Sequence, residues 1–159
     1  MVDVSALGAV HRLNLSSCAA VTSCAGLAGC WVLNLSGTGV CDVSPLAGAG
    51  SCIRTLALRG CKSIADVAAL GACPRLEHLD LTATLVADVS ALGGIHTLTL
   101  AHCGNVRDAS ALGGVRVLDL SYTSVRTVGR LGGCRVLNLK GAARVTDTAA
   151  LTGIEQLIL

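Results

Sequence analysis

The segment His96-Thr97-Leu98-Thr99-Leu100-Ala101-His102-Cys103 decides the fold, because its pair of leucines separated by one residue recurs along the chain. Leucines that alternate with small or polar residues predict a short strand that is buried on one side. The leucine pairs are Leu13/Leu15, Leu33/Leu35, Leu56/Leu58, Leu79/Leu81, Leu98/Leu100, Leu118/Leu120, Leu137/Leu139 and Leu157/Leu159. Eight copies at a nearly constant spacing predict a solenoid in which each copy adds one strand to a single parallel sheet.

The spacing of the pairs follows a rule. Their first leucines lie at 13, 33, 56, 79, 98, 118, 137 and 157, so the steps are 20, 23, 23, 19, 20, 19 and 20 residues. Three residues after each second leucine stands Cys18, Thr38, Cys61, Thr84, Cys103, Thr123 or Ala142. Two residues separate a Cys or Ala from the next apolar position, and one residue separates a Thr from it. The steps of 23 carry inserted residues at 48–52 and 72–75, and we expect both insertions to project from the same side of the solenoid.

The second half of each repeat is typified by Asp88-Val89-Ser90-Ala91-Leu92 and a glycine pair. It is too short for a long helix and predicts a 3₁₀ or one-turn helix on the convex side. We expect the serine to be the N-cap and the glycine pair to be a positive-φ stop. The preceding aspartates could form a metal ladder, but our preferred interpretation is that they accept hydrogen bonds from turn amides from layer to layer. These aspartates are Asp3, Asp42, Asp66, Asp88, Asp108 and Asp147.

The complete unit, Leu-x-x-Leu-x-Leu-x-x-Cys/Thr-x-Val-x-Asp-Val-Ser-Ala-Leu, resembles the leucine-rich repeat over essentially all 159 residues. Its second half is similar to repeats of internalin-like bacterial proteins and of protist leucine-rich-repeat proteins. The resemblance implies a right-handed α/β solenoid with one parallel sheet of about eight strands, and a non-catalytic scaffold for protein–protein interaction. The sequence departs from the family's pattern in two ways. Its repeats are shorter than is usual, and Cys or Thr replaces Asn at the end of the strand. We expect residues 1–159 to form one domain, a fragment of a longer array without caps.

Composition excludes several classes of protein. The residues are 52% hydrophobic, with no Phe, one Trp and one Tyr, as thin layers filled by Leu, Val and Ala require. Polar residues interrupt every apolar run, so no segment approaches the roughly 18 to 20 apolar residues of a membrane-spanning helix. No secretory signal is visible. The nine cysteines are an odd number, and we interpret them as small buried thiols in a reducing, cytoplasmic compartment.

The residues beside the strand leucines should line the concave face in three columns. The third column contains the short side chains of Thr82, Ala101 and Ser121 as well as two long basic ones. This face has few of the Trp, Tyr and Arg anchors of tight interfaces, so weak binding or another binding face is expected. The candidate partner-binding residues on it are Arg12, Asn14, Asn34, Arg59, His78, Asp80, Thr99, Asp119 and Lys140.

A second hypothesis comes from charge. The chain has a formal charge of +2, but residues 107–144 contain seven basic and two acidic residues, a local net of +5. A patch of Arg107, Arg116, Arg126, Arg135 and Arg144 could bind nucleic acid or another anionic surface, although no aromatic residues interleave with it. A third hypothesis is a structural spacer that self-associates end to end through apolar ends such as 157–159.

Motifs for chemistry are few. His78 and Asp80 share one face of a strand and could form a base with its orienting carboxylate, but no nucleophile is placed beside them. His96 and His102 occupy different repeat positions, so no zinc site is expected. Trp31 is expected to pack over the second repeat, with an interface anchor as the alternative. We therefore expect no enzyme, no cofactor and no metal, with another protein as the partner.

Overall fold

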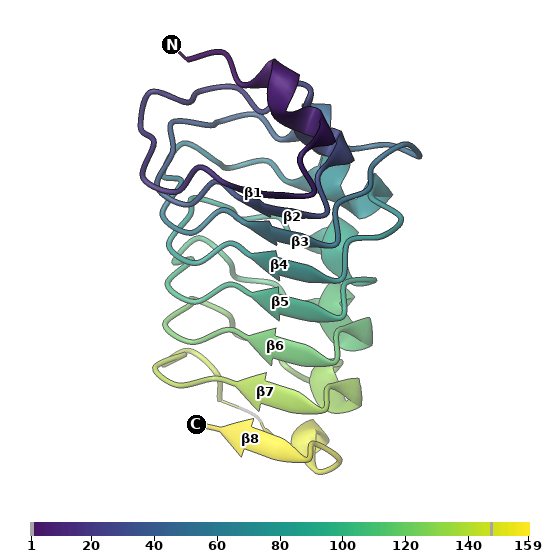
Figure 1. The fold of residues 1–159 in the computed structure, drawn as a ribbon. Helices are drawn as coiled ribbons and strands as arrows, with labels where there is room; N and C mark the ends of the chain where they lie inside the picture. Colours follow the sequence, from purple (N-terminus) through teal and green to yellow (C-terminus); the bar gives the residue numbers. More distant parts are fainter. Residues whose placement is uncertain (1, 147) are drawn as a thin grey trace.

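The computed structural model describes residues 2–146 and 148–159, with Ala150 described by its backbone alone. Within these residues, eight strands form one sheet in the order of the sequence, and every neighbouring pair is parallel. Figure 1 shows them stacked as the rungs of a solenoid. The strands are β1 Arg12–Asn14, β2 Val32–Asn34, β3 Thr55–Ala57, β4 His78–Asp80, β5 Thr97–Thr99, β6 Val117–Asp119, β7 Val136–Asn138 and β8 Gln156–Ile158. The predicted sheet is confirmed.

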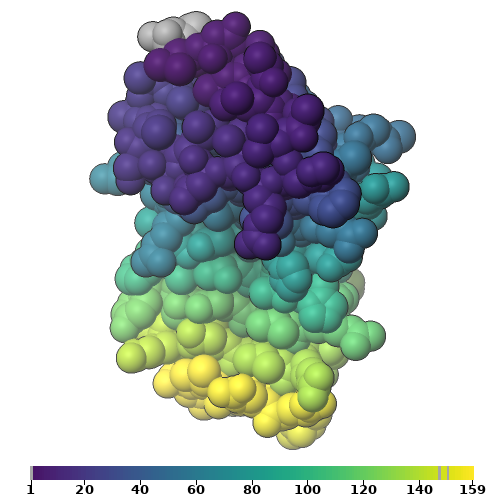
Figure 2. Space-filling model, in the orientation of Figure 1, coloured from purple at the N-terminus to yellow at the C-terminus, as the bar shows by residue number. Residues whose placement is uncertain are grey.

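The register of the sheet follows the repeat. Leu98 of β5 lies between Leu79 of β4 and Leu118 of β6, and the same pairing links the first leucines of all eight strands. Because side chains alternate across a strand, this register stacks the leucines in one inward-facing column. The buried core runs continuously from Val4 in the first layer to Leu151 in the last. Figure 2 shows the first and last repeats at opposite ends of the molecule.

Short 3₁₀ helices precede the strands, as the length of the repeats predicts, and in Figure 1 they stack beside the ends at which the strands begin. Within the described residues they are η1 Ser5–Ala9, η2 Leu27–Gly29, η3 Ser44–Leu46, η4 Ala68–Ala72, η5 Ser90–Leu92, η6 Ser110–Gly114, η7 Leu131–Gly133 and η8 Ala149–Leu151. The two insertions lie at or after the ends of η3 and η4 and before β3 and β4, so both lie on the strand-start side of the solenoid, in successive repeats.

The serine of each repeat is not the N-cap, contrary to our expectation. Ser90 is the first residue of η5, and its N–H donates to Oδ1 of Asp88 at 2.9 Å. The same bond, from the residue two positions further along, is made to Asp3, Asp42, Asp66 and Asp108. The aspartates therefore satisfy turn amides as we expected, but within their own repeat rather than from layer to layer. Asp147 lies outside the described residues.

The glycine pairs are not positive-φ stops either, since Gly93 has φ −64°. They are needed for close approach between layers. A Cβ on Gly114 would lie 2.6 Å from the carbonyl oxygen of Gly93, and a Cβ on Gly113 would lie 2.5 Å from that of Arg130. Only glycine lets neighbouring turns pack at this separation.

The left-handed residue of the repeat lies instead at the end of the strand, two positions after the second leucine. Its φ lies between 56° and 69° in seven successive repeats. The residues are Ser17, Gly37, Gly60, Ala83, His102, Tyr122 and Gly141. Glycine adopts this conformation freely, whereas a bulky side chain in it is uncommon.

The alternation of Cys and Thr after the strands forms a hydrogen-bonded ladder. Oγ1 of Thr84 donates to the carbonyl of Leu81 at 2.8 Å, and Sγ of Cys103, one repeat later, donates to the same oxygen at 3.0 Å. Thr38 and Cys61 share the carbonyl of Leu35 in the same way. A Thr from one layer and a Cys from the next therefore satisfy one buried carbonyl together.

Our interpretation of all nine cysteines as buried is wrong for three of them. Cys18 and Cys41 are exposed and Cys52 is half-buried. Cys18 lies in the first layer, where no preceding repeat is described that could cover it, and Cys41 takes an outward position beside Asp42. All nine are free thiols in the described structure. Burial raises the pKa of Cys24 to about 11, which keeps that thiol protonated.

Candidate functional site

The middle column of the concave face supports the turns that end the strands. Oδ1 of Asp80 accepts the N–H of Thr82 at 2.8 Å, and Asp119 accepts that of Ser121 at 2.8 Å. Asn14, Asn34 and Asn138 make the equivalent bond. Four predicted partner-binding residues, Asn14, Asn34, Asp80 and Asp119, therefore also stabilise the fold. Sequence reasoning missed this role, although Asx residues ahead of a turn are its usual signal.

The third column is less accessible than we expected. Arg59 and Lys140 are exposed, but Thr82, Ala101 and Ser121 are only 4%, 9% and 6% exposed. These side chains are short, so the layers on either side shield them where the chain begins to turn. The accessible part of this column is therefore limited to its long basic members and the half-buried or exposed serines.

The first column carries the exposed Arg12 and His78, with the half-buried Val32 and Thr55 between them and the half-buried Thr97 after His78. The ring of His78 lies edge-on to that of His96, with centroids 6.1 Å apart. Asp80 is bonded to the backbone and hydroxyl of Thr82, not to His78, so the pair does not form a base with its orienting group. In the part of the chain that the structure describes, no three His, Cys, Asp or Glu side chains are grouped to hold a metal.

The strand-start edge is formed by the residue before each strand. Trp31 is 49% exposed here, and its ring meets that of His11 edge-on at 4.4 Å. Trp31 therefore packs against the first repeat rather than over the second. Arg135, on the same edge, pairs with Glu155 at 2.6 Å.

The five arginines of the predicted basic patch lie on two sides of the solenoid. Arg116 and Arg135 are at the strand-start edge, directly before β6 and β7. Arg107, Arg126 and Arg144 follow the turns at the opposite, strand-end edge. The N–H of Arg126 donates to the carbonyl of Arg107 at 3.3 Å, so these two lie in neighbouring layers.

The strand-end edge also carries an aromatic pair that sequence reasoning did not find. His102 and Tyr122 are exposed, and their rings stack with centroids 4.6 Å apart and planes 6° apart. They occupy the left-handed position where three other repeats have glycine. A bulky residue at a position that glycine often fills was the available signal.

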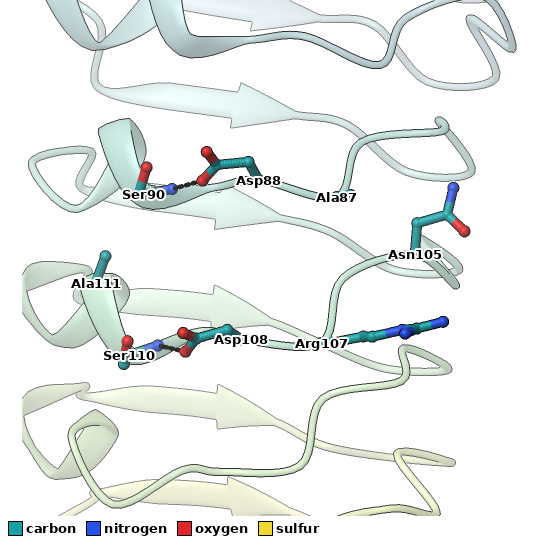
Figure 3. Close-up of a pocket in the computed structure, with 8 residues that line it drawn as sticks. All are labelled: Ala87, Asp88, Ser90, Asn105, Arg107, Asp108, Ser110 and Ala111. Carbon is teal, nitrogen blue, oxygen red and sulfur yellow. Dashed lines mark hydrogen bonds between the residues drawn. The ribbon is translucent and has the colours of Figure 1, made fainter.

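The back of the solenoid has a shallow hollow of about 380 Å³ between the segments around Asp88 and Asp108 (Figure 3). Small residues such as Ala87 and Ala111 leave this space. Figure 3 shows both carboxylates turned to the serines of their own helices, while the Arg107 side chain points away from them. Hydrogen bonds from Ser90 and Ser110 hold the pKa of Asp88 and of Asp108 below the usual range. The carboxylates are therefore engaged within the fold.

These bonds predict acid sensitivity. The pKa of Asp3, Asp42, Asp88 and Asp108 is lowered in the folded chain by hydrogen bonds from the serine two residues on. A lowered pKa stabilises the fold above the unfolded value of about 3.9, and this contribution is lost as the pH falls through the folded value. We expect the urea midpoint to fall between about pH 5 and pH 2, and to fall less when the four are replaced by Asn. Equal pH dependence of the two chains would contradict this account.

The comparison with known proteins identifies the fold. No protein-family model matches the chain, and the comparison with curated proteins gives no match. Among solved structures, internalin InlF of Listeria monocytogenes aligns with a TM-score of 0.72 and 20% identity, over 98% of this chain and 49% of that one. Internalin C2 of the same organism aligns with a TM-score of 0.68 and 24% identity, over 87% of this chain and 64% of that one.

TLR13, in a complex with ssRNA13, aligns with a TM-score of 0.63 and 21% identity, over 85% of this chain and 23% of that one. The chain thus spans about half the length of InlF and less than two thirds of internalin C2. Together with the single parallel sheet and the short 3₁₀ helices, these likenesses show a leucine-rich-repeat solenoid. Its structural neighbours are internalins and TLR13. Over the described residues, no helix has the length and apolar character that crossing a membrane requires.

Proposed function

We propose that this chain is a non-catalytic module that binds another protein through its concave sheet. The observation that carries this proposal is the sheet itself, one open, eight-stranded surface whose outward side chains in the first two columns are half-buried or exposed in the described structure. Such extended concave surfaces are what repeat solenoids use for binding. The predicted residues Arg12, His78, Arg59 and Lys140 are exposed on it and available to a partner.

A binding role without catalysis is supported by the site chemistry. Asp80 is engaged by Thr82, so His78 lacks an orienting carboxylate at the place where catalysis was considered. Burial raises the pKa of the Cys24 thiol to about 11, which makes this nucleophile less reactive. Surfaces built from small polar residues and a few basic anchors fit recognition better than chemistry.

The test blocks the concave face and leaves the fold intact. Thr97→Arg with Thr99→Arg places two long charged chains at the centre of the sheet, where both residues are half-buried. Ala65→Arg, on the exposed back of the solenoid, is the matched control. We expect the wild-type chain and the control to capture the same protein from a native lysate, and the double variant to lose it. Capture that is unaffected by the double variant would contradict concave binding.

A second candidate, binding of nucleic acid or an anionic surface, is favoured by the net charge of +5 over residues 107–144. The TLR13 neighbour is itself in a complex with ssRNA13. A gel shift with a 12-nucleotide single-stranded RNA at two salt concentrations tests it, because phosphate contacts make affinity fall steeply with salt. A salt-independent result, or no shift, would reject it.

Two further expectations remain proposals. End-to-end self-association of the 159-residue chain is supported by apolar side chains that are exposed at its two ends. They are Val2, Val10, Ile158 and Leu159, each 38% exposed or more. Sedimentation over a concentration range tests it.

A cytoplasmic location is supported by the nine free thiols, and localisation of the tagged chain in its own cells tests that.

A further inference from the structure

The backbone of Tyr122, on the strand-end edge, has an unusual conformation. Tyr122 has φ 56°, in the left-handed region, and the equivalent residue is glycine in three other repeats. A bulky residue in this region costs free energy that glycine would avoid, and such residues cluster at functional sites. Tyr122 is nevertheless 47% exposed, so burial of its ring in the core does not explain why it is there.

The ring of Tyr122 lies between two layers. On one side it stacks on His102 of the preceding repeat at 4.6 Å. On the other side it lies against Gly141, where an added Cβ would come within 2.6 Å of its Cδ1. A fixed ring with an exposed edge loses little entropy on binding, which is why tyrosine is frequent among interface anchors.

Three basic residues lie near Tyr122 along the chain or in the adjoining layer. The N–H of Tyr122 donates to the carbonyl of Lys140 at 2.9 Å, so Lys140 lies in the adjoining layer. Arg126 is four residues from Tyr122 and Arg144 is three from Gly141, which limits the Cα separations to about 14 Å and 11 Å. Among the described residues, the one ion pair joins Arg135 and Glu155, so these three cations have no carboxylate partner there.

The acidic residues that the structure describes in this region do not balance those charges. Between residues 101 and 146 the acidic residues are Asp108 and Asp119. Oδ1 of each accepts a backbone N–H of its own repeat, at 2.8 Å in both cases. The strand-end patch, defined as His102, Tyr122, Arg126, Lys140 and Arg144, thus combines an exposed aromatic pair with three nearby cations that form no ion pair with a described carboxylate.

We propose that the strand-end patch docks an extended acidic segment of the partner protein, with Tyr122 as its anchor. Carboxylates of the segment pair with Arg126, Lys140 and Arg144, and one carboxylate accepts a hydrogen bond from the hydroxyl of Tyr122. This inference rests on the proposed protein-binding function and deepens it by naming the chemistry of the partner. The main contact with the partner then lies at the strand-end edge of the sheet and not at its shallow centre.

The geometry favours an acidic protein segment over single-stranded nucleic acid. Proteins that bind single strands offer aromatic faces on which bases stack. One face of the Tyr122 ring is taken by His102, and the ring is closed off on the other side by Gly141. Its edge and hydroxyl remain, and these suit a carboxylate better than a base.

The test is a selection of peptides on the full chain. A phage-displayed library of random 12-residue peptides is panned on the wild type, and selected peptides are synthesised and measured by fluorescence anisotropy. Tyr122→Gly removes the anchor while placing glycine where φ already suits it. Ser17→Gly makes the same change at the equivalent position of the first repeat, far from the patch, and serves as the matched control. Circular dichroism checks that both variants fold.

We expect the selected peptides to be rich in Asp and Glu. We expect Tyr122→Gly, and separately Arg126→Gln with Arg144→Gln, to weaken them by about tenfold or more, as the loss of an anchor or of paired charges does. Ser17→Gly should bind them as the wild type does. Failure to enrich acidic peptides, or equal binding by Tyr122→Gly, would overturn the proposal. A labelled 12-nucleotide RNA would overturn the proposal in favour of nucleic acid if it displaced the peptides, bound the chain with higher affinity than they do, and lost that affinity in Tyr122→Gly.

The same experiment separates this inference from the proposed function. Peptides that bind the wild type and Tyr122→Gly equally, but not Thr97→Arg with Thr99→Arg, would leave concave protein binding standing and remove the strand-end patch. A chain that selects no peptide and captures no protein from the lysate would contradict both.

Discussion

Replacing Leu98 or Leu100 by alanine will cost about 2 to 5 kcal/mol of the free energy of unfolding, as truncations of buried leucines do. Both side chains are fully buried in the middle of the stack. Leu98 lies between Leu79 and Leu118 of the two neighbouring strands, and Leu100 belongs to the same buried core, so no free chain end is available to fill the cavity. Thr99, between them, points to the concave face and is half-buried. Thr99→Ala should therefore change stability by no more than about 0.5 kcal/mol.

Urea unfolding followed by circular dichroism measures all three variants. The pattern of large, small and large effects along three consecutive residues is the expected signature of strand alternation. Equal costs at the three positions would overturn the facing of β5. They would also remove Thr99 from the concave surface on which the binding proposal depends.

Gly114→Ala will destabilise the chain by about 1 to 3 kcal/mol, the usual range for overpacking a close contact. The added Cβ would lie 2.6 Å from the carbonyl oxygen of Gly93, which is backbone and cannot move without shifting a layer. The expected effect comes from the spacing of the layers and not from backbone strain, because Gly114 has no positive φ.

Gly94→Ala is the matched control for that change. Gly94 is the second glycine of the preceding pair, and nothing lies within 4 Å of the position that its Cβ would take. Alanine there should leave stability unchanged, or raise it by up to about 1 kcal/mol by restricting the unfolded chain. A cost at Gly94 similar to that at Gly114 would show that conformational freedom, and not close packing, explains the glycine pairs.

The architecture could be predicted from the sequence because a solenoid is almost one-dimensional. Each repeat contacts its neighbours, so a pattern that recurs along the chain must recur in space. Leu79, Leu98 and Leu118 were assigned to one column from their spacing, and the structure pairs them. The short convex helices followed from the length of the repeat alone.

The roles of the polar residues needed the tertiary structure. The sequence pointed to Ser90 as a cap and to the glycine pair as a left-handed stop, but Ser90 instead donates its N–H to Asp88 and Gly93 has φ −64°. A local pattern can be satisfied by several hydrogen-bond partners one or two residues apart, and only the backbone geometry selects among them.

The candidate site shows the same division. The sequence by itself determined which residues lie on the concave face, since side-chain alternation decides that. It could not determine that Arg116 and Arg126 lie on opposite edges, or that His102 and Tyr122 stack beside Lys140. Those neighbours are about 20 residues apart in the chain and are brought together by the distance between layers. That distance, and the left-handed turn repeated at every strand end, are properties of the stacked structure and not of any single repeat.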